Sequence, residues 1–282
     1  MFTLIAENSR GERLNLTESK NYDLLRVDGL TPPTAAISTA VVGTMDGEKF
    51  NAARLNMRNP VLTIRPRNPV EENRINLYKW FSPKHKVTLY YSNGSREVFT
   101  HGYVESVTGS LFNNPQTFQI SIICPDAYLY DQTEIIQDAS YAEALFEFPF
   151  AVPEEGVELS SYDNIDTVVV INDSDSETGV TIQLRASGDV VNPKIYRRDT
   201  LESFGLNITM QAGDVIEINT RRGSKGVKLY RDGNETNIIN YIDKNVVWFQ
   251  LLPGDNQFTY TADSGDFSLA ATFVYNPRYE GV

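Results

Sequence analysis

Histidine and cysteine, the residue types that most often supply nucleophiles, general bases and metal ligands, are scarce in this chain of 282 residues. His85 and His101 both fall on predicted strands, and neither stands in a Cys–His or Glu-x-x-His spacing that binds a metal. The single cysteine, Cys124, precedes Pro125 at a predicted strand end and is interpreted as a small core residue. Gly-x-Ser-x-Gly, Walker A and Gly-x-Gly-x-x-Gly patterns are absent from the sequence. We therefore predict no catalytic residue, no metal and no cofactor, and we interpret the protein as a non-enzyme.

Carboxylates offer one weaker signal. Asp173, Asp175 and Glu177 alternate as the acids of a calcium loop do, but the glycine is misplaced and the Glu of the twelfth position is missing. An acidic turn between two strands is the better interpretation. A carboxylate pair for glycoside hydrolysis is defined by distance in space, and nothing in the sequence selects a pair.

The charge is negative and unevenly distributed. The net charge of −12 disfavours a nucleic-acid ligand held through phosphate contacts. Residues 1–138 carry a net −1 and residues 139–282 a net −11, so we predict one domain in 1–138 and a second in 139–282. Eight basic and two acidic residues lie between Phe50 and Lys86, whereas ten acids and no base lie between Glu143 and Glu177. Either run could be a solvated face.

Cellular context is indicated by the same composition. A lone cysteine allows no internal disulfide and fits synthesis in a reducing cytosol. The residues from Met1 to Arg10 show no signal-peptide pattern, and no run of apolar residues is long enough to span a membrane.

The first half is predicted to be mostly β, with one helix and one unusual hairpin. Ala36–Met45 and Glu48–Arg58 form a hairpin turned by Asp46–Gly47, a pair that suits a type I′ turn. Its Thr, Ser, Ala, Asn and Arg residues have little to bury, so it either projects onto a neighbour or is a mobile surface hairpin. A helix opens at Pro69 and stops by Ser82, with Ile75, Tyr78 and Leu77 as its apolar stripe. The remaining predicted strands of this half are Met1–Ala6, Arg13–Leu16, Tyr22–Val27, Lys86–Tyr91, Arg96–Glu105 and Gln116–Cys124.

The second half is predicted to be a β-sandwich, because short strands recur there with glycine-rich turns and no helical pattern. Trp248 lies in the run Val246–Phe249 and is interpreted as a core residue. The predicted strands are Thr167–Ile171, Val180–Ala186, Lys194–Tyr196, Leu206–Met210, Val215–Asn219, Val227–Tyr230, Trp248–Leu251, Gln257–Ala262 and Ser268–Tyr275.

A series of short stretches in order along the chain resembles the distal tail proteins of long-tailed phages that infect Gram-positive bacteria. No single motif is specific, and the order across most of the chain carries the likeness. After the N-terminal strands, the Pro-rich turn and the hairpin, the stretches are Tyr78–Phe81, Cys124–Leu129, Gly179–Ile182, Ala186–Gly188, Val191–Ile195, Gly213–Asp214, Ile218–Thr220, Gly254–Asn256 and Arg278–Val282.

The resemblance implies a tail-tube-like first domain with a belt-like hairpin, followed by a galectin-like or carbohydrate-binding-module-like sandwich. It further implies a hexameric ring at the distal end of a non-contractile tail, assembled in the host cytoplasm and carried on the virion. The implied partners are the tail tube protein, a lysin-like tail-associated hub protein and receptor-binding proteins. DNA would pass through the ring without specific binding, and no membrane is implied.

Basic residues around the hairpin are the predicted subunit interface, because arginine pairs well with carboxylates across a contact. The predicted interface residues are Arg54, Arg58, Arg65, Arg67, Asp46 and Gly47. The alternative function is a carbohydrate-binding adhesin that contacts the host cell wall, with Trp248 or a tyrosine stacked on a sugar. The second half has no histidine, which galectin-type sites use, and this disfavours the alternative.

Overall fold

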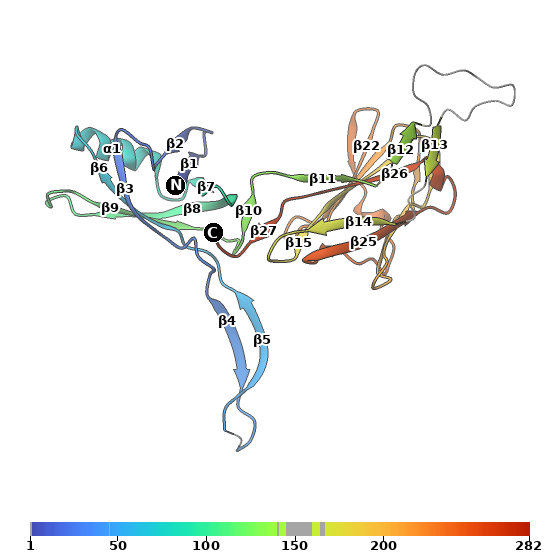
Figure 1. Cartoon of the computed structure of the whole chain (residues 1–282), viewed down its shortest axis with the longest axis horizontal. Helices are drawn as coiled ribbons and strands as arrows, with labels where there is room; N and C mark the ends of the chain where they lie inside the picture. The colour runs from blue at the N-terminus through green and yellow to red at the C-terminus, as the bar shows by residue number, and fades with distance from the viewer. Residues whose placement is uncertain (1, 45, 140, 145–159, 164–166) are drawn as a thin grey trace. The chain divides into compact units, whose positions relative to one another are not determined.

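The computed structural model describes residues 2–44, 46–139, 141–144, 160–163 and 167–282 (Figure 1). The chain forms two compact units, one made of Met1–Thr133 with Arg278–Val282 and the other of Glu134–Pro277. Much of the acidic run, at residues 145–159 and 164–166, lies outside the described residues.

The division differs from the sequence-based one at two places. Residues 134–138 belong to the second unit, because β11 (Ile135–Asp138) pairs antiparallel with β26 (Leu269–Tyr275). Residues 278–282 were assigned to the second domain, but they belong to the first unit. The reason is strand pairing, since β27 (Arg278–Tyr279) pairs antiparallel with β10 (Leu129–Asp131). The chain therefore crosses between the units twice, once after Thr133 and once after Pro277.

The first unit is built on a nine-stranded sheet with the order β2-β1-β7-β8-β9-β6-β3, to which β10 and β27 add beside β8. The predicted strands Lys86–Tyr91 and Arg96–Glu105 are confirmed as β7 and β8, which pair with each other as an antiparallel hairpin. Besides β10 and β27, the strands of the nine-stranded sheet are β1 (Thr3–Asn8), β2 (Arg13–Asn15), β3 (Tyr22–Asp28), β6 (Val61–Pro66), β7 (Lys86–Ser92), β8 (Glu97–Gly109) and β9 (Phe118–Ile123).

The core of this unit lies on one face of the sheet. Phe118, Ile120, Ile122 and Cys124 are all buried, as their alternation predicts. Helix α1 (Val70–Trp80) has Glu71 and Glu72 in its first turn and Lys79 in its last, which suits the helix dipole.

The predicted apolar stripe of the helix is wrong in two positions. Leu77 is fully buried, but Ile75 is 47% and Tyr78 37% exposed. The buried face pairs Leu77 with Asn73 at i, i+4 spacing, and the Asn73 amide is satisfied by the backbone carbonyl of Arg67 at 3.0 Å. A hydrogen-bonded asparagine thus occupies a position that hydrophobic periodicity cannot identify.

The second unit is a β-sandwich of two antiparallel sheets, as predicted. The six-stranded sheet has the order β11-β26-β16-β21-β22-β23, and the four-stranded sheet has the order β14-β25-β18-β19. The strands of the larger sheet are β11 (Ile135–Asp138), β16 (Thr181–Ala186), β21 (Val215–Asn219), β22 (Gly226–Arg231), β23 (Asn234–Asn237) and β26 (Leu269–Tyr275). Those of the smaller sheet are β14 (Val168–Asn172), β18 (Lys194–Arg197), β19 (Ser203–Gly205) and β25 (Gly254–Thr261). Three further pairs are β12 (Tyr141–Ala144) with β13 (Ser160–Asp163), β15 (Thr178–Gly179) with β24 (Gln250–Leu251), and β17 (Val190–Val191) with β20 (Thr209–Met210).

Residues from both sheets form a single core between the layers. Phe258 of the smaller sheet stacks on Phe273 of the larger, with ring centroids 5.0 Å apart, and both are fully buried. Aromatic contact across the layers therefore joins the two sheets.

Trp248 is half-buried rather than enclosed in this core. Its neighbour Phe249 is fully buried, while the Trp248 ring packs edge-on against Phe204 at 5.0 Å. The predicted strand 248–251 is reduced to β24, because Trp248 precedes the paired residues Gln250 and Leu251. Likewise, only Thr209 and Met210 of the predicted strand 206–210 pair as a strand.

Candidate functional site

A two-stranded arm leaves the first unit between β3 and β6. It consists of β4 (Ala35–Ala40) and β5 (Lys49–Leu55), which run out from the sheet (Figure 1). Every residue of the two strands is exposed except Ala40 and Leu55, which are half-buried. The predicted hairpin is confirmed, and its side chains lie open on both faces.

The turn of the arm is longer than predicted. The strands end where Ala40 pairs with Lys49, and Gly43 and Gly47 in the connection between them have positive φ. A two-residue turn at Asp46–Gly47 would place Thr44 opposite Lys49, so the observed register excludes the predicted type I′ turn. Asp46 and Gly47, two of the predicted interface residues, lie at the far end of the arm. Arg54, a third, is exposed on β5.

Arg58 lies at the root of the arm and is only 1% exposed, so its prediction as an interface residue is wrong. Its guanidinium donates to the carbonyls of Gly29 and Thr31, both at 2.8 Å, from the segment that enters the arm. It also donates to the carbonyls of Ala127, at 3.0 Å from Nη2, and of Glu280. Burial lowers the pKa of the Arg58 guanidinium from its ordinary value. With all of these acceptors supplied by the backbone, Arg58 holds three separate segments together.

Gly29 allows the chain to turn closely into the arm. Its φ is +81°, and a Cβ at this position would lie 2.2 Å from the carbonyl oxygen of Asn59. A side chain is therefore excluded by both backbone conformation and space.

The C-terminal residues complete the arm root, a feature that sequence reasoning did not identify. The amide of Val282 donates to the carbonyl of Leu30 at 3.2 Å, and Arg96 donates to the carbonyl of Gly281. The Arg278 guanidinium stacks 3.9 Å from the centre of the Tyr128 ring. The only sequence signal was the Arg278–Val282 stretch itself, because it carries part of the family resemblance.

Arg65 and Arg67 lie at the end of β6 away from the arm and share one carboxylate. Arg65 donates to Asp23 at 2.7 Å, and Arg67 donates to its other oxygen at 2.6 Å. Hydrogen bonds from Arg67 and then Arg65 hold the pKa of Asp23 below its usual value. The structure therefore pairs these two arginines within the chain and separates them from Arg54.

The Asp23 cluster predicts an acid-dependent contribution to stability. A carboxyl whose pKa is lower in the folded state stabilises above its unfolded pKa and loses that effect as pH falls through the folded pKa. We expect wild type to be more stable than Asp23→Asn above about pH 5 and to converge with it toward about pH 2. Thermal unfolding of both proteins across this range measures the difference. Parallel pH profiles for the two proteins would contradict the role of Asp23.

An apolar groove of about 360 Å³ lies between β1 and β3, the last strand of the sheet order. Leu25 stands at the β-bulge of β3 and is 47% exposed. Arg26 is the charged residue of the lining and donates to Asp28 at 2.9 Å. The groove is lined by Phe2, Leu4, Leu24, Leu25, Arg26, Val27, Leu30, Tyr91 and Val282.

Cys124 and His101, whose residue types often act in catalysis, lie in surroundings typical of a structural role. Cys124 is buried, and burial raises the pKa of its thiol, which disfavours the nucleophilic thiolate. His101 hydrogen-bonds Thr88 at 2.9 Å, and partial burial lowers its pKa. Within the described residues, no group of three or more His, Cys, Asp or Glu is placed to hold a metal ion. No helix among those residues is long and apolar enough to cross a membrane.

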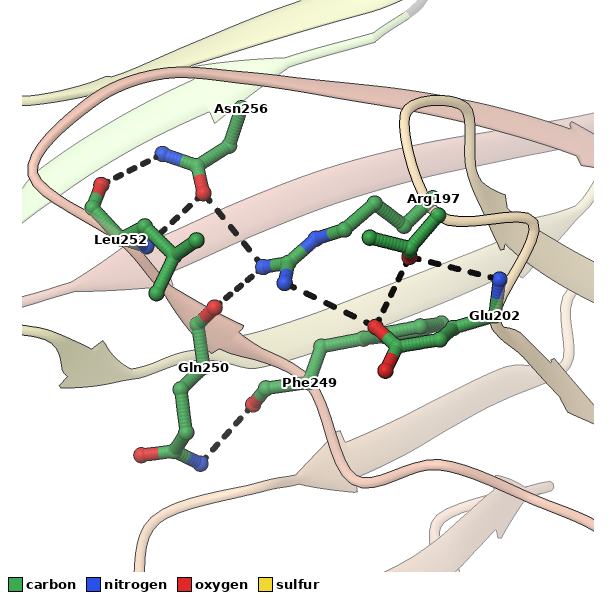
Figure 2. A network of polar contacts seen from close by, with 7 residues as sticks. Arg197, Glu202, Phe249, Gln250, Leu252 and Asn256 are labelled. Atoms are coloured by element: carbon green, nitrogen blue, oxygen red, sulfur yellow. Dashed lines mark hydrogen bonds and ion pairs between the residues drawn. The ribbon is translucent and has the colours of Figure 1, made fainter.

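In the second unit, a buried arginine organises the loops at one end of the smaller sheet. Figure 2 shows the Arg197 guanidinium among the carbonyl of Gln250, the side chain of Asn256 at 3.4 Å and the carboxylate of Glu202 at 3.7 Å. Its guanidinium carbon lies 5.9 Å from the centre of the Phe249 ring and 5.5 Å from that of the Phe258 ring. Asn256 also accepts from the amide of Leu252 at 2.8 Å, which closes that loop. The network ties β18 to the loop around β24, while Arg197 Nε and Gln250 Oε1 are buried without a hydrogen-bond partner.

Comparison with known proteins agrees with this architecture. Residues 173–279 match the family described as siphovirus-type tail component, C-terminal domain. No curated protein sequence matches the chain.

Two solved structures share the fold over the whole chain. The Dit protein of phage SPP1, described as a paradigm of the hub adsorption apparatus of phages that infect Gram-positive bacteria, superposes with a TM-score of 0.72. It is 14% identical and covers 99% of both chains. A chain of the phage P2 baseplate in its activated conformation with calcium has a TM-score of 0.57, 12% identity and full coverage of both chains.

These matches confirm the resemblance that the order of short stretches indicated. The sandwich of the second unit matches at the level of sequence, and both units together match at the level of fold. The chain is thus similar to the siphovirus-type tail components over residues 173–279, and it has the fold of a phage distal tail protein throughout.

Proposed function

We propose that six copies of this chain close into a ring at the distal end of a long non-contractile phage tail. In this role the first unit forms the ring, joins the tail tube to a tail-associated hub protein, and anchors receptor-binding proteins. The chain acts as a structural protein with no catalytic activity, and DNA passes through the ring without specific binding.

The observation that carries the proposal is the exposed arm with its buried root. A hairpin whose residues are solvated on both faces contributes little to its own unit, yet Arg58 fixes its origin through four backbone carbonyls. Such a rigidly rooted projection suits contact with another chain. Because the arm and the surface that would receive it are different patches, the contact is head-to-tail and closes into a ring when its rotation allows.

Charge supports placing the ring contact in the first unit. Residues 1–133 with 278–282 carry a net +1 whereas residues 134–277 carry a net −13, so copies repel least through the first unit. Arg54, exposed on the arm, is the available arginine for a carboxylate of the neighbour.

Arg54→Glu should block assembly while leaving both units folded. Reversing an interfacial charge costs several kcal/mol, so we expect the ring population to fall by more than about tenfold. Electron microscopy of assembled tail tips, or mass photometry at high protein concentration, measures the rings. Arg10→Glu, an exposed change in the first unit away from the arm, is the matched control and should assemble normally. A two-fold dimer through the second unit with the arm exposed would contradict the proposal.

The adhesin alternative depends on Trp248, whose partly exposed ring is the surface on which a sugar would stack. The Trp248 ring packs edge-on with Phe204, and the Lys225 ammonium lies 5.5 Å from the centre of the Trp248 ring. These two residues therefore already occupy part of the space around the ring. We expect Trp248→Ala to destabilise the second unit by about 1–3 kcal/mol, less than the loss of a fully buried aromatic side chain. Calorimetry and binding to host cell-wall polysaccharide should be measured together. Unchanged stability with lost polysaccharide binding would favour the adhesin function.

A further inference from the structure

We propose that the segment Arg278–Val282, here named the strap, sets the direction of the arm and so prepares it for assembly. Arg96 and Gly281 are then positioning residues, because they act on the arm through the strap. The inference rests on the proposed ring. It follows from the contacts of the strap with both sides of the arm root, from the anchoring of the strap, and from the few contacts that the arm makes of its own.

The strap lies against the segment that enters the arm. Gly281 is buried, and a Cβ at its position would lie 2.6 Å from Cδ and 3.0 Å from the nitrogen of Pro32. One residue further on, the amide of Val282 donates to the carbonyl of Leu30 at 3.2 Å. Only glycine allows the two segments to approach this closely without displacing one of them. The entry segment is therefore held by close contact and by a hydrogen bond.

The strap also reaches the residue at which the chain leaves the arm. Arg58 lies just after β5 and donates to the carbonyl of Glu280 and, at 3.0 Å, to that of Ala127. Ala127 lies just before β10, which pairs with β27 of the strap (Figure 1). The chain runs on from β10 to the second unit and returns from it into β27. Both strands that connect the units therefore meet at the arm root.

Two arginines anchor the strap to the first unit independently of the arm. The guanidinium carbon of Arg96, in the turn between β7 and β8, lies 4.2 Å from the centre of the Tyr279 ring, and Arg96 also donates to the carbonyl of Gly281. Arg278 is 6% exposed, and its guanidinium carbon lies 3.9 Å from the centre of the Tyr128 ring. Cation–π contacts strengthen where water is excluded. The strap thus has a fixed place from which it can orient the arm.

The arm itself has little that could fix its direction. All residues of β4 and β5 are exposed except Ala40 and Leu55, which are half-buried. A two-stranded hairpin alone is marginal in water, so its orientation depends on its root. An element whose direction is already set loses less freedom on binding and therefore binds more tightly. We expect that loosening the strap lowers ring formation, although it changes no residue of the arm.

Gly281→Ala tests the strap in the full-length chain by adding one methyl group. The new Cβ overlaps Pro32, so we expect the amides of Val282 and Asn56 to exchange with solvent at least about tenfold faster than in wild type. These amides report on the root, because that of Val282 bonds to Leu30 and that of Asn56 bonds to the carbonyl of Thr34 at 2.9 Å. Amides at the centre of β7 should exchange as in wild type. Hydrogen exchange read by NMR measures all of them.

A compensating change distinguishes arm positioning from general damage. Pro32→Ala removes the ring atoms that the new methyl group would overlap, so the chain with Gly281→Ala and Pro32→Ala should return to within about threefold of the exchange rates of Pro32→Ala alone. Gly226→Ala, where a Cβ meets nothing within 4 Å, is the matched control and should change neither exchange nor assembly. Circular dichroism melts establish that every variant is folded.

Ring formation supplies the second readout. We expect Gly281→Ala to lower the population of closed rings by at least about tenfold, and the added Pro32→Ala to restore it. Arg96→Met removes the donor to Gly281 and the contact with Tyr279 without adding bulk, and it should act in the same direction. Electron microscopy of assembled tail tips counts the rings.

The outcomes separate this inference from the proposed function. Unchanged exchange at Val282 and Asn56 in folded Gly281→Ala, or faster exchange with rings as abundant as in wild type, overturns the strap and leaves the ring function standing. A double variant that fails to recover overturns the strap as well. Wild-type tail tips without a closed ring overturn the proposed function, and with it the role of the strap in assembly. Faster exchange and lost rings in Gly281→Ala, both recovered by Pro32→Ala, support the strap.

Discussion

Arg58→Met is expected to lower the free energy of unfolding of the first unit by about 3–5 kcal/mol. The guanidinium of Arg58 is 1% exposed and donates to the carbonyls of Gly29, Thr31, Ala127 and Glu280. Methionine fills much of the same space but donates to none of them, so buried carbonyls lose their partners. The loss should be largest at the arm root and at the C-terminal residues, because these segments supply the carbonyls that Arg58 binds.

Calorimetry measures the transition of the first unit, and hydrogen exchange locates the loosened segments. Arg54→Met is the matched control, because it removes an arginine that is exposed on the arm, and its unfolding should be unchanged. An Arg58→Met protein that melts like wild type but fails to assemble would restore Arg58 as an interface residue. By the same reasoning, charge reversal at Arg58 acts on folding and is unsuitable as a probe of the interface.

Phe258→Ala is expected to destabilise the second unit by about 3–5 kcal/mol. Phe258 is fully buried, stacks on Phe273 at 5.0 Å across the two sheets, and meets Phe249 edge-on at 5.4 Å. The Arg197 guanidinium also lies 5.5 Å from the centre of its ring. Truncation therefore leaves a cavity at the layer contact and removes a surface that supports the network in Figure 2.

Calorimetric unfolding of Phe258→Ala should be compared with that of Phe267→Ala. Phe267 is a phenylalanine of the same unit and is exposed, so its truncation should change stability by less than about 0.5 kcal/mol. Equal effects of the two substitutions would contradict the assignment of the core. The effect of Trp248→Ala should fall between them, since that ring is half-buried.

Local patterns along the chain were sufficient for most of the fold. Alternation placed Phe118, Ile120, Ile122 and Cys124 in a core, and glycine-punctuated strands indicated the sandwich. The Pro69 start predicted helix α1, and the weakly apolar composition of residues 36–58 predicted a hairpin with little to bury in its own domain. These features depend on residues close together in the sequence, so each could be predicted without knowing the partners that the segments meet.

The tertiary structure decided which predicted interface residues are accessible. Arg54 and Arg58 have the same chemistry and lie close in the sequence, but one is exposed on the arm and the other is enclosed by carbonyls from residues 29, 31, 127 and 280. Asp23 similarly accepts hydrogen bonds from Arg65 and Arg67, which are far from it in the sequence. The return of residues 278–282 to the first unit and the half-exposed face of Trp248 were also beyond local patterns. Burial and hydrogen-bond partners depend on segments distant in sequence. The residue type at one position does not specify which segments those will be.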